Sequence, residues 1–150
     1  MDDFDRKILR ILQRDGRITN AALAQSIHLS PAATLERVRR LEQKGIIKGY
    51  MAILAPSSLQ FGILVLVEVT LDRSEDDLFT RFANAVRTIP QITECHMVAG
   101  GFDYLLKARV KDMAAYRRFL GQTLTRLPGI RQTHTYTVME EVKNELALPL

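Results

Sequence analysis

Three arginines, Arg37, Arg39 and Arg40, lie close together in the sequence PAATLERVRRLEQK. A guanidinium group presents a planar fork of N–H donors that matches two oxygens of a phosphate, or the O6 and N7 edge of guanine. These residue types indicate binding to a polyanion, with nucleic acid as the leading candidate. The alternative is a solvated helix face in which Glu36 and Arg40 form an ion pair four residues apart.

A second group of residues, Gly100-Gly101-Phe102-Asp103, has the composition of a ligand loop. Backbone N–H groups free of side chains can hold a carboxylate, and the Asp103 side chain can pair with an ammonium group. Those are the two charges of a free amino acid. The alternative is a tight turn in which the glycines supply positive φ angles.

Other kinds of chemistry find little support in the sequence. The single cysteine, Cys95, excludes an internal disulfide and a multi-cysteine metal site. His28, His96 and His134 do not have metal-ligand spacing, and we find neither a nucleophile–base pair nor a glycine-rich nucleotide loop. We therefore expect no metal, no cofactor and no enzymatic activity.

The distribution of charge separates the two halves of the chain. Residues 1–50 contain 10 Lys/Arg and 6 Asp/Glu, which accounts for the whole net charge of +4, whereas residues 51–150 contain 11 of each. A basic excess confined to one module favours a polyanion partner there. The longest apolar run, Ile63–Val67, is too short to span a membrane. With one cysteine and no secretory signal pattern at the N-terminus, we expect a cytoplasmic protein that does not contact membranes.

The elements that position the arginines are predicted to be three helices, at residues 3–14, 20–27 and 31–44. Ser30 is a good N-cap and Pro31 suits the first helical position, so the third helix begins there. The pattern predicts that this helix buries Leu35, Val38 and Leu41. Its opposite side is then Ala32, Ala33, Glu36, Arg40 and Gln43, with Arg37 and Arg39 on the flanks. A helix pair with this distribution is typical of a helix-turn-helix that enters a DNA major groove.

The residues after the third helix are predicted to form a wing and a linker. Residues 46–54 resemble a strand, a turn and a strand, in which Lys48 would reach a phosphate; a plain connecting strand is the alternative. Residues 55–62 concentrate Pro, Ser and Gly and mark a domain boundary. The expected domains are therefore a winged helix-turn-helix at 1–54, a linker at 55–62 and a second domain at 63–150.

The second domain has a regular alternation of apolar strands and helices. Strands are expected at 63–71, 92–99, 102–110 and 130–142, with helices that begin at Ser74 and after Asp112. The order βαββαβ predicts a ferredoxin-like antiparallel sheet with both helices on one face, so the fold class is α+β.

The other face of this sheet needs a partner. The first strand is apolar on both sides for part of its length, and such strands are usually covered on both faces. A second copy of the sheet is the expected cover, which predicts a homodimer. RNA-binding domains share the βαββαβ order, and Phe102 and Tyr104 loosely resemble their stacking residues. However, Asp103 lies between them and this half carries no net charge, so RNA is the weaker alternative.

Several separated stretches resemble the leucine-responsive and asparagine-type (Lrp/AsnC) family of bacterial transcription regulators, and especially its leucine-responsive branch. They are DRKILRILQRDGRITNAALA, LSPAATLERVRRLEQKGIIKGY, GGFDYLLKARVKDMAAYRRFLG and RLPGI followed by TYTVMEEVK. The resemblance implies a winged helix-turn-helix that binds double-stranded DNA and a βαββαβ domain that dimerises. It also implies further assembly, commonly into octamers, and a small effector, usually an amino acid, bound between subunits.

The helix geometry and the resemblance together give two sets of candidate site residues. The candidate DNA-binding residues are Ser30, Ala32, Ala33, Glu36, Arg37, Arg39, Arg40 and Lys48. By the resemblance, the effector-binding residues are Met97, Gly100, Gly101, Asp103, Met113, Tyr136, Thr137 and Val138. We expect a sequence-specific transcription regulator that responds to an amino acid. The alternative is a DNA-binding protein whose sheet domain has no effector and only assembles subunits.

Overall fold

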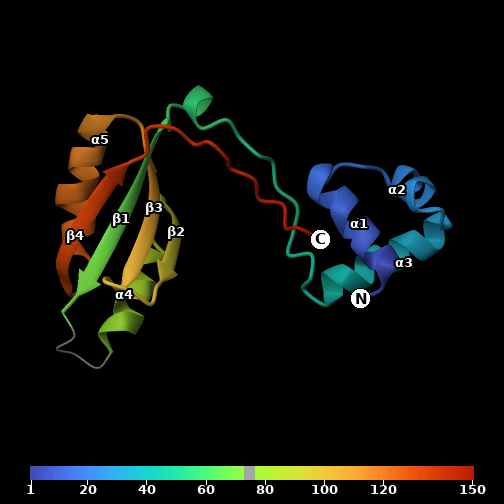
Figure 1. Ribbon diagram of the computed structural model, residues 1–150, viewed down its shortest axis with the longest axis horizontal. Helices are drawn as coiled ribbons and strands as arrows, with labels where there is room; N and C mark the ends of the chain where they lie inside the picture. The colour runs from blue at the N-terminus through green and yellow to red at the C-terminus, as the bar shows by residue number, and fades with distance from the viewer. Residues whose placement is uncertain (73–76) are drawn as a thin grey trace. The chain divides into compact units, whose positions relative to one another are not determined.

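The computed structural model describes residues 1–72 and 77–150, which form two compact units (Figure 1). One unit is Met1–Ile53 together with Lys143–Leu150, and the other is Leu54–Val142. The helices described in the first unit are α1 (Asp3–Arg14), α2 (Asn20–Ile27) and α3 (Pro31–Gln43). None of the helices in the described part of the chain is long and apolar enough to cross a membrane.

The helices of the first unit begin where the sequence predicts, because each has a side-chain cap. Asp2 and Asp5 form a capping box at the start of α1, in which each side chain accepts the backbone N–H of the other. Thr19 caps α2, and the Ser30 hydroxyl accepts the N–H of Ala33 at 3.2 Å. At the other end of α3, Gly45 has a φ of +67°, a left-handed conformation that suits glycine and ends the helix.

The core of the first unit shows which side of α3 faces inward. Its fully buried residues are Ile8, Leu9, Leu23, Ile27 and Leu41. Thr34 is also buried, and its hydroxyl donates to the Ser30 carbonyl at 3.0 Å. The prediction that Leu35 is buried is wrong, since 38% of its surface is exposed. The inward stripe of α3 is Thr34, Val38 and Leu41, rotated from the predicted one because α1 and α2 pack on the Thr34 side.

The segment after α3 contains no strand in the described structure, so the predicted strand, turn and strand at 46–54 are wrong. Two backbone N–H groups, those of Ile46 and Ile47, donate to the Leu41 carbonyl at the end of α3. The chain then continues in an irregular, exposed conformation. A two-stranded hairpin without a third strand or a helix against it is marginally stable, which explains the missing pairing.

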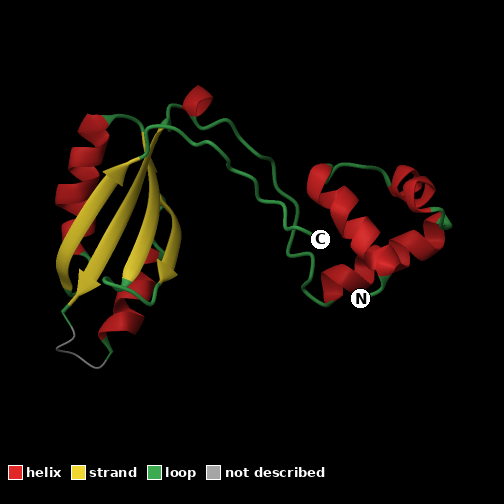
Figure 2. Cartoon of the chain, viewed as in Figure 1, coloured by secondary structure: helices red, strands yellow, loops and turns green. Residues whose placement is uncertain are grey.

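The second unit is a four-stranded antiparallel sheet in the order β2-β3-β1-β4. Its strands are β1 (Ile63–Leu71), β2 (Ile92–Met97), β3 (Tyr104–Val110) and β4 (Ile130–Thr137). Its longer helices are α4 (Leu78–Val86) and α5 (Met113–Arg118); the remaining helical turns are η1 (Ser57–Leu59), η2 (Phe119–Thr123) and η3 (Leu124–Arg126). Figure 2 shows the helices behind one face of the sheet, which confirms the ferredoxin-like arrangement.

Some element ends differ from the prediction. The last strand was predicted to reach residue 142, but β4 ends at Thr137 because its partner, β1, begins at Ile63. The strands at 92 and 102 are likewise shorter by two residues each. The predicted helix start at Ser74 lies outside the described residues.

The open face of the sheet is more polar than the sequence pattern predicts. Leu64, Leu66 and Leu105 form an apolar strip at its centre, as expected. Charged residues surround this strip, and several are paired in the structure. The ion pairs on or beside this face are Lys107–Glu94 at 2.9 Å, Arg109–Glu141 at 2.7 Å, His96–Glu94 at 3.2 Å and His134–Glu68 at 3.9 Å.

Candidate functional site

The position of α3 is fixed at its N-terminal end by polar contacts with the preceding turn. His28 ends α2 in a left-handed conformation, with a φ of 58°. The side-chain amide of Asn20 donates to the Pro31 carbonyl at 2.8 Å, which joins the start of α2 to the start of α3. Together with the Ser30 cap, these contacts hold the two helices at a fixed angle, as a helix-turn-helix requires.

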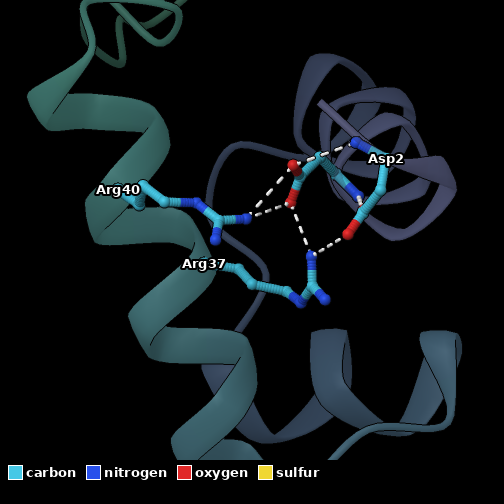
Figure 3. A network of polar contacts seen from close by, with 4 residues as sticks. Asp2, Arg37 and Arg40 are labelled. Atoms are coloured by element: carbon cyan, nitrogen blue, oxygen red, sulfur yellow. Dashed lines mark hydrogen bonds and ion pairs between the residues drawn. The ribbon is translucent and has the colours of Figure 1, made fainter.

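Two of the three predicted arginines form an ion-pair network with the first turn of α1 (Figure 3). The Nη1 atom of Arg37 donates to Asp2 Oδ2 at 2.7 Å and to Asp5 Oδ1 at 2.9 Å. The Nη2 atom of Arg40 lies 3.1 and 3.2 Å from the two carboxylate oxygens of Asp5. Arg37 also stacks over the Phe4 ring, with its guanidinium carbon 5.3 Å from the ring centre.

The electrostatics of this network favour the charged form of every member whose pKa shifts. Burial alone raises the pKa of Asp5, but the hydrogen bonds from Arg37 and from the Asp2 backbone outweigh it, so the pKa is lowered. The hydrogen bond from the Asp5 N–H, followed by that from Arg37, lowers the pKa of Asp2. The two carboxylates in turn raise the pKa of Arg37. The network is therefore fully ionised at neutral pH.

The rotation of α3 changes which arginine faces outward. With Thr34 and Leu41 buried, a helix of about 100° per residue places Ala32, Glu36, Arg39 and Gln43 on the opposite side. The prediction that Arg40 is the outermost arginine is wrong. Arg40 lies on the α1 flank with Arg37, and Arg39 is exposed with no ion pair among the described residues.

The remaining DNA-binding candidates lie at the two ends of α3. Ser30 and Ala33 lie at its N-terminus, where the Ser30 hydroxyl serves as the cap. Lys48 is exposed in the segment after α3 and lines a groove of about 290 Å³ that includes Leu12 and Tyr50. The structure therefore brings the helix candidates together on one side of the unit and adds Lys48 beyond the helix C-terminus.

The glycine loop lines an open groove of about 560 Å³ at one end of the sheet. The residues lining it are Thr70, Leu71, Asp72, Gly100, Gly101, Phe102, Asp103 and Arg131. Neither Gly100 nor Gly101 has a positive φ, and an added Cβ would meet nothing within 4 Å at either position. The turn that needs positive φ is therefore absent, and both glycines border open space.

Asp103 is part of the framework of this groove. Its side chain is buried, and Oδ2 accepts the N–H of Leu71 at 2.8 Å. Its backbone N–H donates to the Val69 carbonyl at 2.9 Å, so both contacts join the loop to β1. The exposed charges in the groove are instead Asp72 and Arg131. Sequence reasoning missed Arg131, because only the pairing of β1 with β4 brings it beside the loop.

The other predicted effector residues do not join this groove within one chain. Met97 lies at the same end of the sheet, since it pairs with Tyr104, but it is largely exposed. Met113, Thr137 and Val138 lie at the opposite end, where β4 ends beside the start of β1. The length of β4 puts about 20 Å between the two ends. Tyr136 lies near that far end on the open face, where the Glu68 charge raises its pKa.

The aromatic residues that suggested RNA binding are not placed for stacking on the open face. Tyr104 is buried on the helix side of the sheet, with its ring centre 4.7 Å from that of Phe82. A base cannot stack on a ring that is enclosed in the core. In the described part of the chain, no group of three or more His, Cys, Asp or Glu side chains is arranged to hold a metal ion.

Comparisons with known proteins match both units. Residues 1–48 match the winged helix-turn-helix DNA-binding family, and residues 64–148 match the Lrp/AsnC ligand binding domain. The leucine-responsive regulatory proteins of Klebsiella pneumoniae and of Escherichia coli K12 are each 56% identical over 143 residues, which is 95% of this chain and 87% of the relative.

Solved structures agree with the sequence relatives. A transcriptional regulator from Neisseria meningitidis, in complex with L-Met, has a TM-score of 0.95 and 36% identity, covering 99% of this chain and 96% of its own. An AsnC family transcriptional regulator from Agrobacterium tumefaciens has a TM-score of 0.95 and 33% identity, covering 99% and 97%. These matches confirm the resemblance and the fold class expected from the sequence. The chain therefore belongs to the Lrp/AsnC family of DNA-binding transcription regulators, in its leucine-responsive branch.

Proposed function

We propose that α3 enters the major groove of double-stranded DNA and that its outer side reads the base sequence. The observation that carries this proposal is the exposed side of α3, on which Arg39 and Glu36 stand clear of the core. An Arg fork pairs with guanine, and a Glu carboxylate accepts from the cytosine amino group. Ala32 is small enough to let the helix N-terminus approach the base edges.

The contacts to the DNA backbone come from the flanks and ends of the same helix. The residues proposed for phosphate contact are Ser30, Ala33 through its backbone, Arg37, Arg40 and Lys48. The whole positive excess of the chain lies in residues 1–50, so the long-range attraction to DNA acts on this unit. DNA as the partner also supports a cytoplasmic location and a regulatory rather than an enzymatic role.

The effector proposed for the glycine loop is a free amino acid. The groove presents one exposed cation, Arg131, and one exposed anion, Asp72, beside Gly100 and Gly101. An amino acid carries the complementary pair of charges, and its side chain would contact Met97. Asp103 supports the site by holding the loop on β1. The complex with L-Met of the Neisseria relative supports an effector of this class.

The effector site is proposed to be completed by another subunit. Met113, Tyr136, Thr137 and Val138 lie toward the opposite end of the sheet from the groove, so a neighbouring copy has to bring them to it. The apolar strip Leu64, Leu66 and Leu105 supports a homodimer that packs sheet against sheet. Contacts between dimers, as in an octamer, would then join the two ends. A ligand at such a contact shifts assembly only if it favours one arrangement.

One alternative remains in the same class of proteins, a DNA-binding protein whose sheet domain only assembles subunits. The observation that favours it is Asp103, whose carboxylate is used to hold β1. A thermal-shift screen against the twenty amino acids separates the two. Because a ligand of the native state raises its stability, the effector hypothesis predicts a rise in Tm with at least one amino acid. No rise with any of them favours the architectural protein.

A further inference from the structure

Asp5 combines two properties that a surface carboxylate does not have. Its side chain is only 4% exposed, yet it receives ion pairs from two arginines of another helix, Arg37 and Arg40. A buried carboxylate is retained in a protein only when hydrogen bonds compensate for its lost hydration. The arginines provide that compensation here, and both reach Asp5 from the flank of α3 that borders its outer side.

The two arginines keep donors that the network does not use. Arg37 bonds to the carboxylates through Nη1 alone, and Arg40 through Nη2 alone. Their remaining N–H groups make no hydrogen bond to any other described residue. The Arg37 side chain is 24% exposed and that of Arg40 is 46% exposed, so these groups face solvent at least in part. Each guanidinium is therefore held at one edge and open at another.

We propose that Asp5, with Asp2, is a positioning residue for DNA recognition that fixes Arg37 and Arg40 before DNA binds. This inference rests on the proposed DNA-binding role of α3. A flexible arginine loses side-chain freedom when it contacts DNA, and an arginine already held by a carboxylate has lost that freedom on folding. The fixed donors then fit one register of the helix on the DNA and disfavour the others.

The charge of the network gives this role a measurable signature. Asp2 and Asp5 balance Arg37 and Arg40, so the four side chains together are neutral at pH 7. They add little to the sequence-independent attraction of DNA, which depends on uncompensated positive charge. Their contribution lies in geometry. Neutralising Asp5 therefore strengthens binding to random DNA while it weakens the preference for the correct sequence.

A role limited to packing predicts a different result. If Asp5 only joined α1 to α3, its replacement would lower stability, but the folded fraction would bind both kinds of DNA with an unchanged ratio of affinities. The ratio is independent of the fraction folded, because that fraction enters both affinities equally. It is the readout that separates positioning from packing.

The test compares Asp5→Asn with Asp3→Asn in the full chain. Asp3 lies in the same first turn, is exposed and makes no ion pair among the described residues, so its replacement removes the same charge without touching the arginines. The probes are the duplex that the wild-type protein enriches from a random library and a random-sequence duplex. Dissociation constants are measured over several salt concentrations, with Tm and oligomer size as controls for folding.

The expected result is a loss of about tenfold in the specificity ratio for Asp5→Asn, the scale of one arginine contact to a base pair. Asp3→Asn should keep the wild-type ratio. A folded Asp5→Asn protein with the wild-type ratio overturns the inference. If Asp5→Asn does not fold, Asp2→Asn replaces it, since Asn is an equally good N-cap and only the Arg37 contact is lost. An unchanged ratio in Asp2→Asn then overturns the inference.

Failure of the underlying function gives a separate outcome. If the wild-type protein enriches no duplex at all from the library, sequence-specific binding itself is contradicted, and the result concerns the proposed function before it concerns Asp5. If the wild-type protein enriches a sequence, the comparison of variants addresses the positioning role alone.

Discussion

The Asp5 Oδ1 atom of α1 lies 3.1 Å from the Arg40 Nη2 atom of α3, although the two residues are 35 positions apart in the chain. This contact places the first turn of one helix against the basic flank of the other. It also removes Arg40 from the outer side of α3 and leaves Arg39 there. The division of work among the arginines follows from this single relationship.

Arg39→Ala should weaken binding to the preferred duplex by about tenfold, with a much smaller effect on random DNA, since Arg39 is the outermost arginine of α3. Fluorescence anisotropy with both duplexes at fixed salt measures the effect. Arg126→Ala, an exposed arginine in the other unit, is the matched control. Equal losses in the two variants would argue against direct contact by Arg39.

Asp5→Asn should lower the stability of the first unit by about 1–3 kcal/mol at pH 7, since it removes a charged acceptor from two arginines. The pKa of Asp5 lies below its ordinary value of 3.8 in the folded protein. Its contribution is therefore complete above that value and is lost as the pH falls through the lower, folded pKa. Urea denaturation at pH 7 and in acid should show the difference between wild type and variant shrinking at low pH. A difference that grew in acid would contradict this account.

The sequence predicted the ends of the helices well and the rotation of α3 poorly, for a physical reason. Caps such as Ser30 and Gly45 act through their own neighbours, so a local pattern reveals them. The buried side of α3 depends on where α1 and α2 pack, and a rotation by one residue exchanged Leu35 for Thr34 in the core. The Asp5–Arg40 contact is equally long-range, and no local rule contains it.

The ligand groove had a similar mixture of success and failure. The glycine loop was found from its composition, and the family resemblance supplied the rest of the set. Arg131 was missed because its position depends on the register of β1 against β4. The resemblance also grouped Met97 with Met113, which the fold of one chain separates.

Arg131→Ala should remove any rise in Tm caused by an amino acid, while the Tm of the free protein stays within about 2 °C of wild type. The side chain is exposed and has no ion pair among the described residues, so its loss costs little stability. Differential scanning fluorimetry with and without the ligand tests both parts. Arg117→Ala, exposed on α5 and away from the groove, serves as the control. A full ligand response in Arg131→Ala would exclude Arg131 from the site.

Asp103→Ala should instead lower the stability of the free protein, by about 1–3 kcal/mol, since the buried N–H of Leu71 loses its acceptor. Thermal unfolding without ligand is the measurement. Asp112→Ala, which removes a carboxylate cap at an exposed helix start, gives a reference for an ordinary loss of about 1 kcal/mol. A Tm equal to that of wild type would mean that the carboxylate of Asp103 is free for another role.

Leu66→Glu should disrupt the homodimer, because it places a charge in the apolar strip of the open sheet face. Light scattering should then give a smaller particle than wild type at the same concentration. Gln122→Glu, exposed on the helical side, adds the same charge away from the strip and should keep the wild-type size. Loss of assembly in both variants, or in neither, would contradict sheet-to-sheet pairing.

The most direct measurement of the whole account is the affinity of the wild-type protein for its own enriched duplex, with and without each of the twenty amino acids. The account predicts that at least one amino acid changes this affinity or the size of the complex, and that Arg131→Ala abolishes the change. An enriched duplex whose binding no amino acid alters would contradict the effector-responsive function and leave an architectural DNA-binding protein.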